Sequence, residues 1–337
     1  MKRSFLTSLM PLWSLASLFL GCGGDTVARP PAKVESAPMA ATEWSTGPHV
    51  RVLGTMQDGG LPHPGCTCSR CESARQDPQA KRYVTSIALV VPETRQVYLF
   101  DATPDLAHQL YQVRDIHTTP MGRVDRLPVD GVFLTHAHIG HYLGLAYFGY
   151  EAISSSGLRV FSTPRMADFL RHNGPWSQLV DRENILLEEI RPGDQIDIAP
   201  GVTVEAFSAP HRDEFADTLG YVLHGPEKSL VYLPDTDSWA AWSSPVADFL
   251  SEIDVALVDG TFFSSDELPG RRVESIGHPL ISTTMDLLQD LIDSTEIEVF
   301  FTHLNHSNEA LDRNGAELRE IERRGFEVLD EGDRFDL

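Results

Sequence analysis

Three histidines lie within six residues of this chain, in the segment THAHIGH at residues 135–141. The segment follows the apolar run Val132–Leu134, which is typical of a buried strand. Because residues two apart share one face of an extended chain, His136 and His138 are expected to point their imidazoles to the same side. Imidazole is a common ligand of zinc and iron. The pattern therefore predicts a metal site where a strand ends, with a run of surface histidines near a turn as the alternative.

A histidine or an aspartate follows each of three other apolar runs, at the point where a strand would end. These residues are His211, Asp235 and His303. Because loops at one edge of a sandwich bring strand ends together, we expect them to join His136 and His138. Imidazole and carboxylate together suit zinc, iron or manganese. Asp235 is placed to hold the attacking water or to bridge two ions.

Other residues with the same chemistry are open to two interpretations. His278 lies between a glycine and a proline and is a candidate general acid or substrate contact, or a loop histidine with no role. Asp213 and Glu214 follow His211 and are interpreted as solvated loop carboxylates rather than metal ligands. Three further histidines are interpreted as surface residues: His49, His172 and His224.

A second cluster of potential ligands lies in residues 65–71, GCTCSRC, which place three cysteines within six residues. Thiolates bind zinc strongly, and four ligands complete a tetrahedron. The triplet therefore predicts a structural zinc site with a histidine as the fourth ligand. His306 is the first candidate for that ligand and His63 the second. A disulfide between two of the cysteines, with one free thiol, is the alternative.

The overall charge narrows the range of substrates. The chain carries 49 acidic residues against 27 Lys and Arg, a formal net charge of −22. A nucleic-acid backbone would be repelled at long range by this acidity, so nucleic acid is discounted as a substrate or partner. A small-molecule substrate is expected instead.

The beginning of the chain is typical of an exported protein. Two basic residues precede an apolar stretch that ends at Gly21-Cys22, and together they predict a secretory signal peptide over residues 1–22. The small residue before Cys22 resembles the lipobox of bacterial lipoproteins, in which the cysteine is lipidated. Ordinary cleavage nearby or a short membrane anchor is the alternative. The expected location is therefore the bacterial cell envelope, with a membrane contact through the lipid.

The remaining chain divides into a tether and one folded domain. Residues 23–47 are rich in Pro, Ala, Ser and Thr and predict a flexible linker, and the domain is expected over residues 48–337. Strands are expected at residues 50–53, 86–91, 97–100, 132–134, 158–162, 202–207, 219–223, 230–233, 255–258, 298–301 and 326–329. Helices are expected at residues 105–113, 142–153, 164–172, 283–292 and 309–324. This pattern predicts an α/β fold in which two sheets pack face to face with helices outside.

The motif at residues 135–141 resembles that of the metallo-β-lactamase superfamily, whose fold is an αββα sandwich of two mixed β-sheets flanked by helices. The resemblance extends from residue 50 to the C-terminus. It implies that the active-site metal ligands are His136, His138, His141, His211, Asp235 and His303. It also implies that Asp101, after the run 97–100, holds one ligand imidazole in a single tautomer.

This sequence departs from the superfamily's His-x-His-x-Asp-His motif at one position, where Gly140 replaces the aspartate. That aspartate normally binds the second metal ion. Its absence leaves His141, Asp235 and His303 as ligands of that ion, and water or another carboxylate would complete the coordination. Both one and two active-site ions fit the sequence. Loss of an anionic ligand also makes the site more positive, which is compatible with an anionic substrate group.

A narrower resemblance involves the run LGTMQDGG at residues 53–60 and the cysteine triplet. Together they resemble two branches of the superfamily, the pyrroloquinoline-quinone biosynthesis protein B and the cyclic-phosphate phosphodiesterase of the carbon–phosphorus lyase pathway. The second branch implies a structural zinc held by Cys66, Cys68, Cys71 and His306. Residues 100–105 and 302–308 resemble the first branch.

These features predict a metal-dependent hydrolase that acts on a small phosphodiester or another ester through a metal-activated water, with Asp235 and His278 as catalytic residues. Zinc is expected at one or two active-site positions and at the structural site, and iron or manganese also fits the active site. Two alternatives stay open. One is an iron-dependent oxidoreductase similar to the quinone-biosynthesis branch, and the other is a non-catalytic metal-binding lipoprotein.

Overall fold

The computed structural model describes residues 47–114, 126–267 and 277–337. Their strands form two seven-stranded sheets. The first sheet has the order β14 (Arg334–Asp336), β1 (His49–Gly54), β2 (Ser86–Val91), β3 (Gln96–Phe100), β4 (Gly131–Phe133), β5 (Leu158–Ser162) and β6 (Ile185–Glu189). The second has the order β13 (Glu327–Val328), β12 (Glu298–Thr302), β11 (Val255–Asp259), β10 (Ser229–Leu233), β9 (Leu219–His224), β8 (Val202–Ser208) and β7 (Gln195–Ala199).

The two sheets are mixed in the same way. Counted from β14 in the first sheet, three antiparallel pairs are followed by three parallel pairs. Counted from β7, the second sheet repeats this order. Parallel strands place their carboxyl ends at one edge of a sheet, so the loops that follow β3, β4, β10, β11 and β12 emerge where functional side chains can converge.

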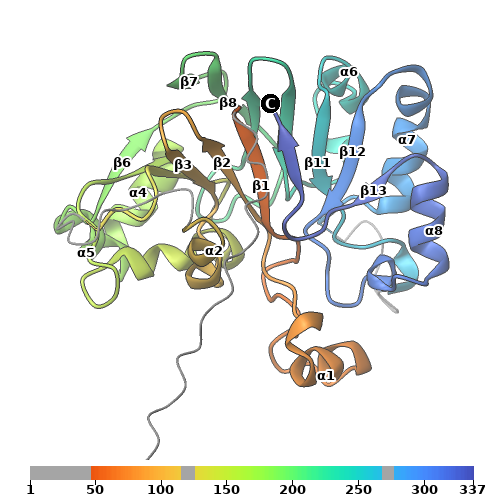
Figure 1. Ribbon diagram of the computed structural model, residues 1–337, viewed down its shortest axis with the longest axis horizontal. Coiled ribbons are helices and arrows are strands. Elements are labelled where there is room, and N and C mark those ends of the chain that lie inside the picture. Colours follow the sequence, from red (N-terminus) through yellow and green to blue (C-terminus); the bar gives the residue numbers. More distant parts are fainter. Residues whose placement is uncertain (1–46, 115–125, 268–276) are drawn as a thin grey trace, which may run out of the picture. The chain divides into compact units, whose positions relative to one another are not determined.

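Helices cover the outer face of each sheet, as Figure 1 shows. An apolar cluster joins the first sheet to α2 (Leu106–Gln112), α4 (Pro164–His172) and α5 (Trp176–Asp181). Another joins the second sheet to α6 (Val246–Leu250), α7 (Ile281–Ser294) and α8 (Ala316–Arg323). The remaining α-helices are α1 (Ser69–Gln76) and α3 (Ile139–Tyr142). This αββα arrangement confirms the predicted fold class.

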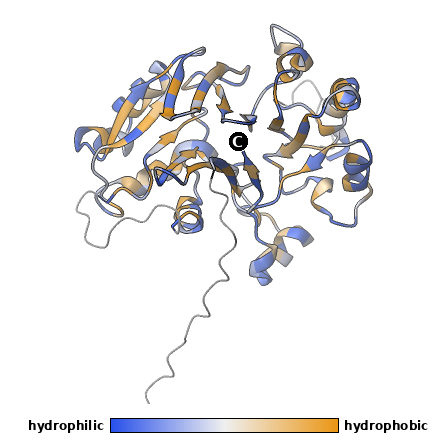
Figure 2. Ribbon diagram, turned by 45° about the horizontal axis from the view of Figure 1, so that its top comes forward, coloured by the Kyte–Doolittle hydropathy of each residue, from blue (hydrophilic) through white to orange (hydrophobic). Residues whose placement is uncertain are grey.

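A third apolar cluster fills the space between the sheets. Hydrophobic residues accordingly concentrate on the strands in Figure 2. In β8 the alternation of buried and half-buried residues points Val202 and Val204 into this core. The ring of Phe133 lies 4.2 Å from that of Phe161 and 5.0 Å from that of Phe100, centroid to centroid. Each such buried side chain contributes about 1.5–3 kcal/mol, and together they fix the strand that leads into the histidine motif.

Local structure differs from the sequence prediction at several places. The strands β6, β7 and β14 and the helices α1, α5 and α6 lie outside the predicted set. The predicted helix over residues 142–153 is wrong in type, because a 3₁₀ helix spans Leu143–Phe148. The predicted helix over residues 309–324 is interrupted between Glu309–Leu311 and α8, where Gly315 donates to the Asp312 carbonyl in a turn.

The predicted signal peptide, Cys22 and nearly all of the linker lie in residues 1–46, outside the described residues. Among the residues that are described, no helix combines the length and the apolar character needed to cross a membrane. The prediction of a surface position is wrong for His49, which is 1 % exposed in β1.

Candidate metal centre

Strand ends from both sheets bring the predicted ligands into one buried cluster. His136 and His138 follow β4, and His141 lies in α3. Asp235 follows β10 and His303 follows β12, while His211 comes from the loop after β8. Only the rim of the cluster is open, since the side chain of His138 is 14 % exposed whereas that of Asp235 is 3 % exposed.

The backbone around the motif is fixed from both sheets. The Tyr221 hydroxyl of β9 donates to the carbonyl of Leu134, and the amide of Leu219 donates to the carbonyl of Thr135. The Thr135 amide and hydroxyl in turn donate to Asp101 Oδ1, at 2.8 and 3.0 Å. These contacts join the end of β4 to both β3 and β9. They therefore hold the start of the histidine motif in a fixed position relative to the second sheet.

Two residues of the cluster have left-handed backbone conformations, Asp101 at φ 70° and His303 at φ 61°. Such conformations cost a non-glycine residue about 1–3 kcal/mol and persist only where surrounding contacts impose them. Both residues directly follow strands that lead into the cluster. Local strain is therefore retained at the positions where side chains must turn toward a common centre.

One group of donor atoms contains His136, His138, His211 and Asp235. His136 Nε2 lies 2.8 Å from His138 Nδ1, and His211 Nε2 lies 3.2 Å from the same atom. Asp235 approaches His136 Nε2 at 3.3 Å and His211 Nε2 at 3.2 Å. Ligands held about 2.1 Å from a tetrahedral zinc ion are about 3.4 Å apart, so this group fits one divalent cation.

A neighbouring group contains Asp58, His141 and His303, whose donor atoms lie within 4.8 Å of one another. Asp235 Oδ2 lies 3.8 Å from the Nε2 atoms of both histidines and 3.3 Å from His136 Nε2. Asp235 therefore stands between the two groups, as predicted for a bridging carboxylate. The buried atoms His141 Nε2, His303 Nε2 and Asp58 Oδ1 have no hydrogen-bond partner within the described residues, which suits a cation as their common partner.

Asp101 contacts the cluster as the sequence predicted. Its Oδ2 lies 2.7 Å from His141 Nδ1 in a fully buried environment. This contact orients the ring so that Nε2 faces the second group. Burial opposes protonation of His141, but the carboxylate of Asp101 outweighs it and raises the pKa of His141 to about 9. A cation at this position therefore displaces a proton from the ring.

His278 lies beside the cluster in a network of carboxylates and a hydroxyl. Its Nδ1 is 2.8 Å from Asp259 Oδ2 and 3.2 Å from Asp235 Oδ1. Asp259 ends β11 and also accepts the hydroxyl proton of Thr261 at 2.7 Å. Burial lowers the pKa of His278, but Asp259 and Asp235 outweigh it and hold that pKa well above 6.5. The two carboxylates at Nδ1 thus favour the protonated form of His278.

His136 and His303 favour the neutral ring, and Asp235 favours the charged carboxylate. At His211, burial opposes protonation, but the contact with Asp235 outweighs it and raises the pKa of that ring. Burial holds the pKa of His136 well below 6.5 and lowers that of His303. Burial opposes ionisation of Asp235, but the positive charge of His278 outweighs it and holds the Asp235 pKa well below 3.8. Neutral imidazole and ionised carboxylate are the forms that bind metal ions.

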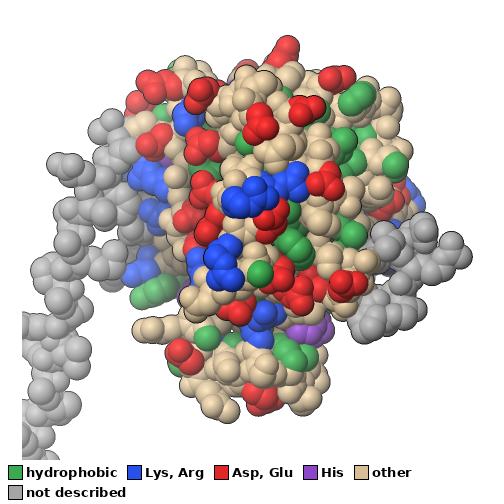
Figure 3. Space-filling model, turned by 90° about the vertical axis from the view of Figure 1, so that its right-hand side faces the viewer, with side chains coloured by type: hydrophobic (Ala, Val, Ile, Leu, Met, Phe, Trp, Pro, Cys, Tyr) green, Lys and Arg blue, Asp and Glu red, His purple; other side chains and the backbone are tan. Residues whose placement is uncertain are grey.

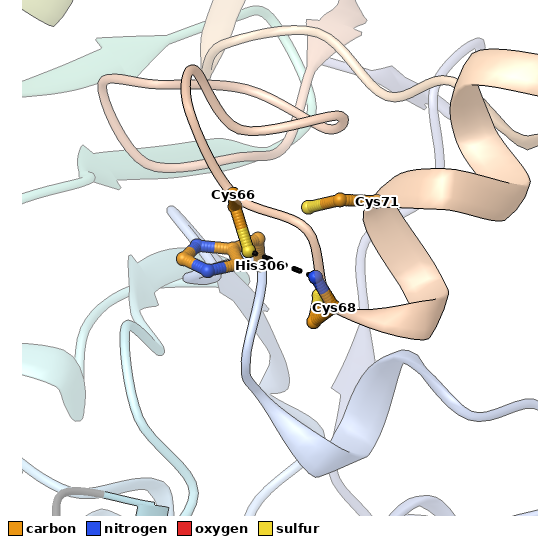
Figure 4. Close-up of side chains that lie close together, drawn as sticks. All are labelled: Cys66, Cys68, Cys71 and His306. Carbon is orange, nitrogen blue, oxygen red and sulfur yellow. Dashed lines mark hydrogen bonds between the residues drawn. The ribbon is translucent and has the colours of Figure 1, made fainter.

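The three predicted cysteine ligands and His306 also converge, as Figure 4 shows. They come from the loop before α1, from α1 itself and from the loop after β12, and all three cysteines are free thiols. Within the described residues the His306 Nδ1 atom is buried without a hydrogen-bond partner. His63, the second candidate, lies outside the group of donor atoms, and its ring packs 4.3 Å from that of His306. Three sulfurs and one imidazole fit a closed zinc site.

Sequence reasoning missed two carboxylates. Asp58 lies in the loop after β1, and Asp259 lies at the end of β11. The rule that found Asp235, an acid at the end of an apolar run, would also have found Asp259. Glu214, interpreted as solvated, contacts His138 Nε2 at 3.0 Å from a 45 % exposed position, and Asp213 accepts a hydrogen bond from Thr218.

Comparison with known proteins agrees with this geometry. A family model described as the beta-lactamase superfamily domain matches residues 96–304, more than half of the chain. The Coenzyme PQQ synthesis protein B of Methylorubrum populi is 25 % identical over 312 residues, which cover 86 % of this chain and 100 % of the relative.

Two solved structures share the fold. The zinc-bound structure of PqqB from Methylobacterium extorquens superposes with a TM-score of 0.71 at 23 % identity, covering 86 % of this chain and 100 % of that one. A diphosphatase from the PhnP family superposes with a TM-score of 0.60 at 18 % identity, covering 86 % and 97 %. Both likenesses agree with the αββα fold described above.

Proposed function

This chain belongs to the beta-lactamase superfamily, and from that premise we propose that it is a metal-dependent hydrolase of a small phosphodiester or another small ester. The observation that carries the proposal is the convergence of His136, His138, His211 and Asp235 donor atoms from separate strand ends. These residues would hold a divalent cation, which would lower the pKa of a water molecule to about 7 and polarise the substrate oxygen.

The residues around the cation would orient the attacking water, position a ligand and protonate the leaving group. Asp235, between the two donor groups, orients the attacking water through its carboxylate. Asp101 holds His141 through Nδ1 and keeps the ring turned toward the centre. His278, which is 10 % exposed beside Asp235, would donate a proton to the leaving oxygen.

The rim of the cluster supports an anionic substrate with an apolar group. Arg212 directly follows His211, is 58 % exposed, pairs with Glu214 at 3.3 Å and lies beside Gly277, the neighbour of His278. Ile139 and Phe215 are each 57 % exposed. Ile139 directly follows His138 and Phe215 directly follows Glu214, the two residues that contact each other at the rim. A guanidinium and exposed apolar side chains close in sequence to the metal ligands suit a phosphate ester of an apolar alcohol.

Elsewhere the surface is acidic. Figure 3 views the side of the molecule that carries α7 and α8, where acidic side chains are spread among Lys and Arg. The arginines of this side pair locally, as Arg323 does with Glu320 at 2.6 Å and Arg324 with Asp286 at 2.8 Å. These pairs leave little positive charge for a polyanion, so we retain the proposal that nucleic acid is not a substrate.

The test is turnover of a chromogenic phosphodiester, bis(p-nitrophenyl) phosphate, by the full-length protein loaded with zinc or manganese. We expect turnover that His136→Ala reduces more than about 100-fold, because even a residue behind a ligand is worth 10–100-fold. The control is Asp168→Asn, an exposed carboxylate on α4. Tight metal binding without turnover of phosphodiesters or carboxylic esters would instead favour a non-catalytic metal-binding protein.

Similarity to Coenzyme PQQ synthesis protein B over its full length supports a second candidate, an iron-dependent oxidoreductase. Three histidines with open positions also suit Fe(II). Iron in the protein as isolated, together with oxygen consumption and no phosphodiester turnover, would favour this candidate over hydrolysis.

We also propose that the protein is a lipoprotein of the bacterial cell envelope, anchored through Cys22. The support is the sequence alone, a lipobox-like Gly21-Cys22 after an apolar stretch. Labelling of cells with a fatty-acid analogue should mark the protein, and Cys22→Ala should abolish the label. A wild-type protein that is not labelled and fractionates as soluble would contradict this proposal.

A further inference from the structure

Gly140 occupies the position at which the superfamily motif has an aspartate, and the space for that side chain is already filled. A Cβ atom added to Gly140 would lie 2.0 Å from Asp58 Oδ1 and 2.8 Å from Asp58 Cα. No residue larger than glycine fits at position 140 while the loop after β1 keeps this path. The carboxylate of Asp58 therefore stands where a side chain from position 140 would begin.

The Asp58 carboxylate meets two imidazoles that are prepared to bind a cation. His141 Nε2 lies 3.6 Å from Asp58 Oδ1, and its Nδ1 contacts Asp101. His303 Nδ1 lies 2.9 Å from the Thr261 hydroxyl, which gives its own proton to Asp259. The Thr261 oxygen must therefore accept a hydrogen bond from the N–H of His303 Nδ1, which leaves a lone pair on Nε2 of the neutral ring.

Each atom of this group is buried without another partner. Asp58 Oδ1, His141 Nε2 and His303 Nε2 have no hydrogen bond within the described residues, and both histidines are 0 % exposed. Asp235 Oδ2 lies 3.8 Å from both Nε2 atoms and adds a second carboxylate. Buried polar atoms left without partners are costly, and one divalent cation would satisfy all of them.

The loop that carries Asp58 is attached to the segment that carries His303. The Gln57 amide donates to the Leu304 carbonyl at 2.9 Å, and the Leu304 amide donates to the Thr55 carbonyl at 2.9 Å. The side chain of Asn305 also donates to Gln57 Oε1. These bonds fix the separation between Asp58 and His303 independently of β4 and α3.

We propose that Asp58 replaces the missing motif aspartate and, with His141, His303 and Asp235, binds a second divalent cation in the active site. The carboxylate comes from the loop after β1 instead of from the histidine motif. This inference rests on the proposed function only in placing both cations in one active site, because the binding itself does not depend on the reaction.

The test compares the zinc content of full-length variants equilibrated at one free zinc concentration. The wild type should hold one more equivalent than Asp58→Asn or Asp58→Ala, and the affinity of the second site should fall at least about 10-fold in these variants. Asp168→Asn is the control, and circular dichroism confirms folding. Equal zinc content in the wild type and both Asp58 variants would overturn the inference.

A reciprocal exchange sharpens the test. Gly140→Asp alone should destabilise the protein because its side chain meets Asp58, whereas Asp58→Gly combined with Gly140→Asp should recover the lost equivalent of zinc. If the double variant binds no more zinc than Asp58→Gly, position 58 does not substitute for position 140. Loss of zinc in Asp58→Asn from a protein that hydrolyses no ester would support the inference and contradict the proposed function.

Discussion

The histidine cluster and the cysteine cluster both fit metal ions, but they are built differently. Ligands of the histidine cluster come from chain segments as far apart as Asp58 and His303, each at or near the end of a strand in a packed sheet. The cysteine cluster takes three ligands from residues 66–71 and a fourth from His306. Figure 1 shows α1, which contains Cys71, standing away from the two sheets.

The difference indicates which of the two clusters depends on a bound metal ion for its structure. Three apolar clusters surround the strands that hold the histidines, so those side chains keep their places through the core of the sandwich. In α1, by contrast, only Cys71 and Ala74 are buried. An eight-residue helix is too short to be stable alone, so we propose that a zinc ion bound by the cysteines supplies much of the energy that orders this segment.

Loss of the cysteine zinc should therefore give the largest change in structure. We expect Cys68→Ser to lose one zinc equivalent and to lower Tm by at least about 5 °C, because structural zinc binding is coupled to folding. His136→Ala should lose metal from the histidine cluster but keep its circular dichroism spectrum. Zinc content and thermal unfolding measure both variants, with Thr67→Ala as the control. A Cys68→Ser protein as stable as the wild type would break the comparison.

A smaller effect, on turnover, is expected for Asp101, which contacts His141 but belongs to neither donor group. Asp101→Asn keeps the shape of the side chain but removes the charge that orients His141. Turnover should fall about 10–100-fold with the fold intact. Asp105→Asn is a matched control, because Asp105 also accepts a backbone amide, that of Val84, and lies outside both clusters. Unchanged kinetics in Asp101→Asn would show that the strands alone orient the ring.

The smallest expected effect concerns the pH dependence of thermal stability and a residue outside both clusters, His49. Burial lowers the pKa of His49 in β1 to about 4, below its ordinary value of 6.5. The unfolded chain therefore takes up a proton first as the pH falls, so the stabilisation is complete above pH 6.5 and is lost toward pH 4. Between pH 7 and 5 the wild-type Tm should fall about 2–4 °C more than that of His49→Gln. His172→Gln, an exposed-site control, should follow the wild type.

Short-range patterns in the sequence were sufficient for the sandwich and for most of its strands. Apolar runs such as Ser86–Val91 and Leu158–Ser162 are buried on both faces or nearly so, and their bounds match the prediction. The edge strands β6 and β7 were not predictable in this way, because they contain charged and exposed residues such as Glu188 and Asp197. Pairing with a neighbouring strand, which is a tertiary interaction, determines their structure.

Short-range patterns were likewise sufficient for only part of the candidate site. Histidines in a compact motif were found because spacing alone brings them together. Asp58 was not, because it lies 82 residues before Gly140 and reaches the histidines only through the bonds between Gln57 and Leu304. His49 was misjudged because no local pattern distinguishes a buried histidine at the start of a strand from an exposed one.

The repeated order of strand pairing has a consequence for biosynthesis. Asp58, Asp101 and the motif at residues 136–141 belong to the part of the chain that precedes β7, whereas Asp235 and His303 follow it. In a growing chain the first donor group is therefore complete once Asp235 has been synthesised after β10, whereas the second group lacks His303 until β12 has been synthesised. Since β14 pairs with β1, the first and last strands of the domain can join only after the last ligand, His303, has been synthesised.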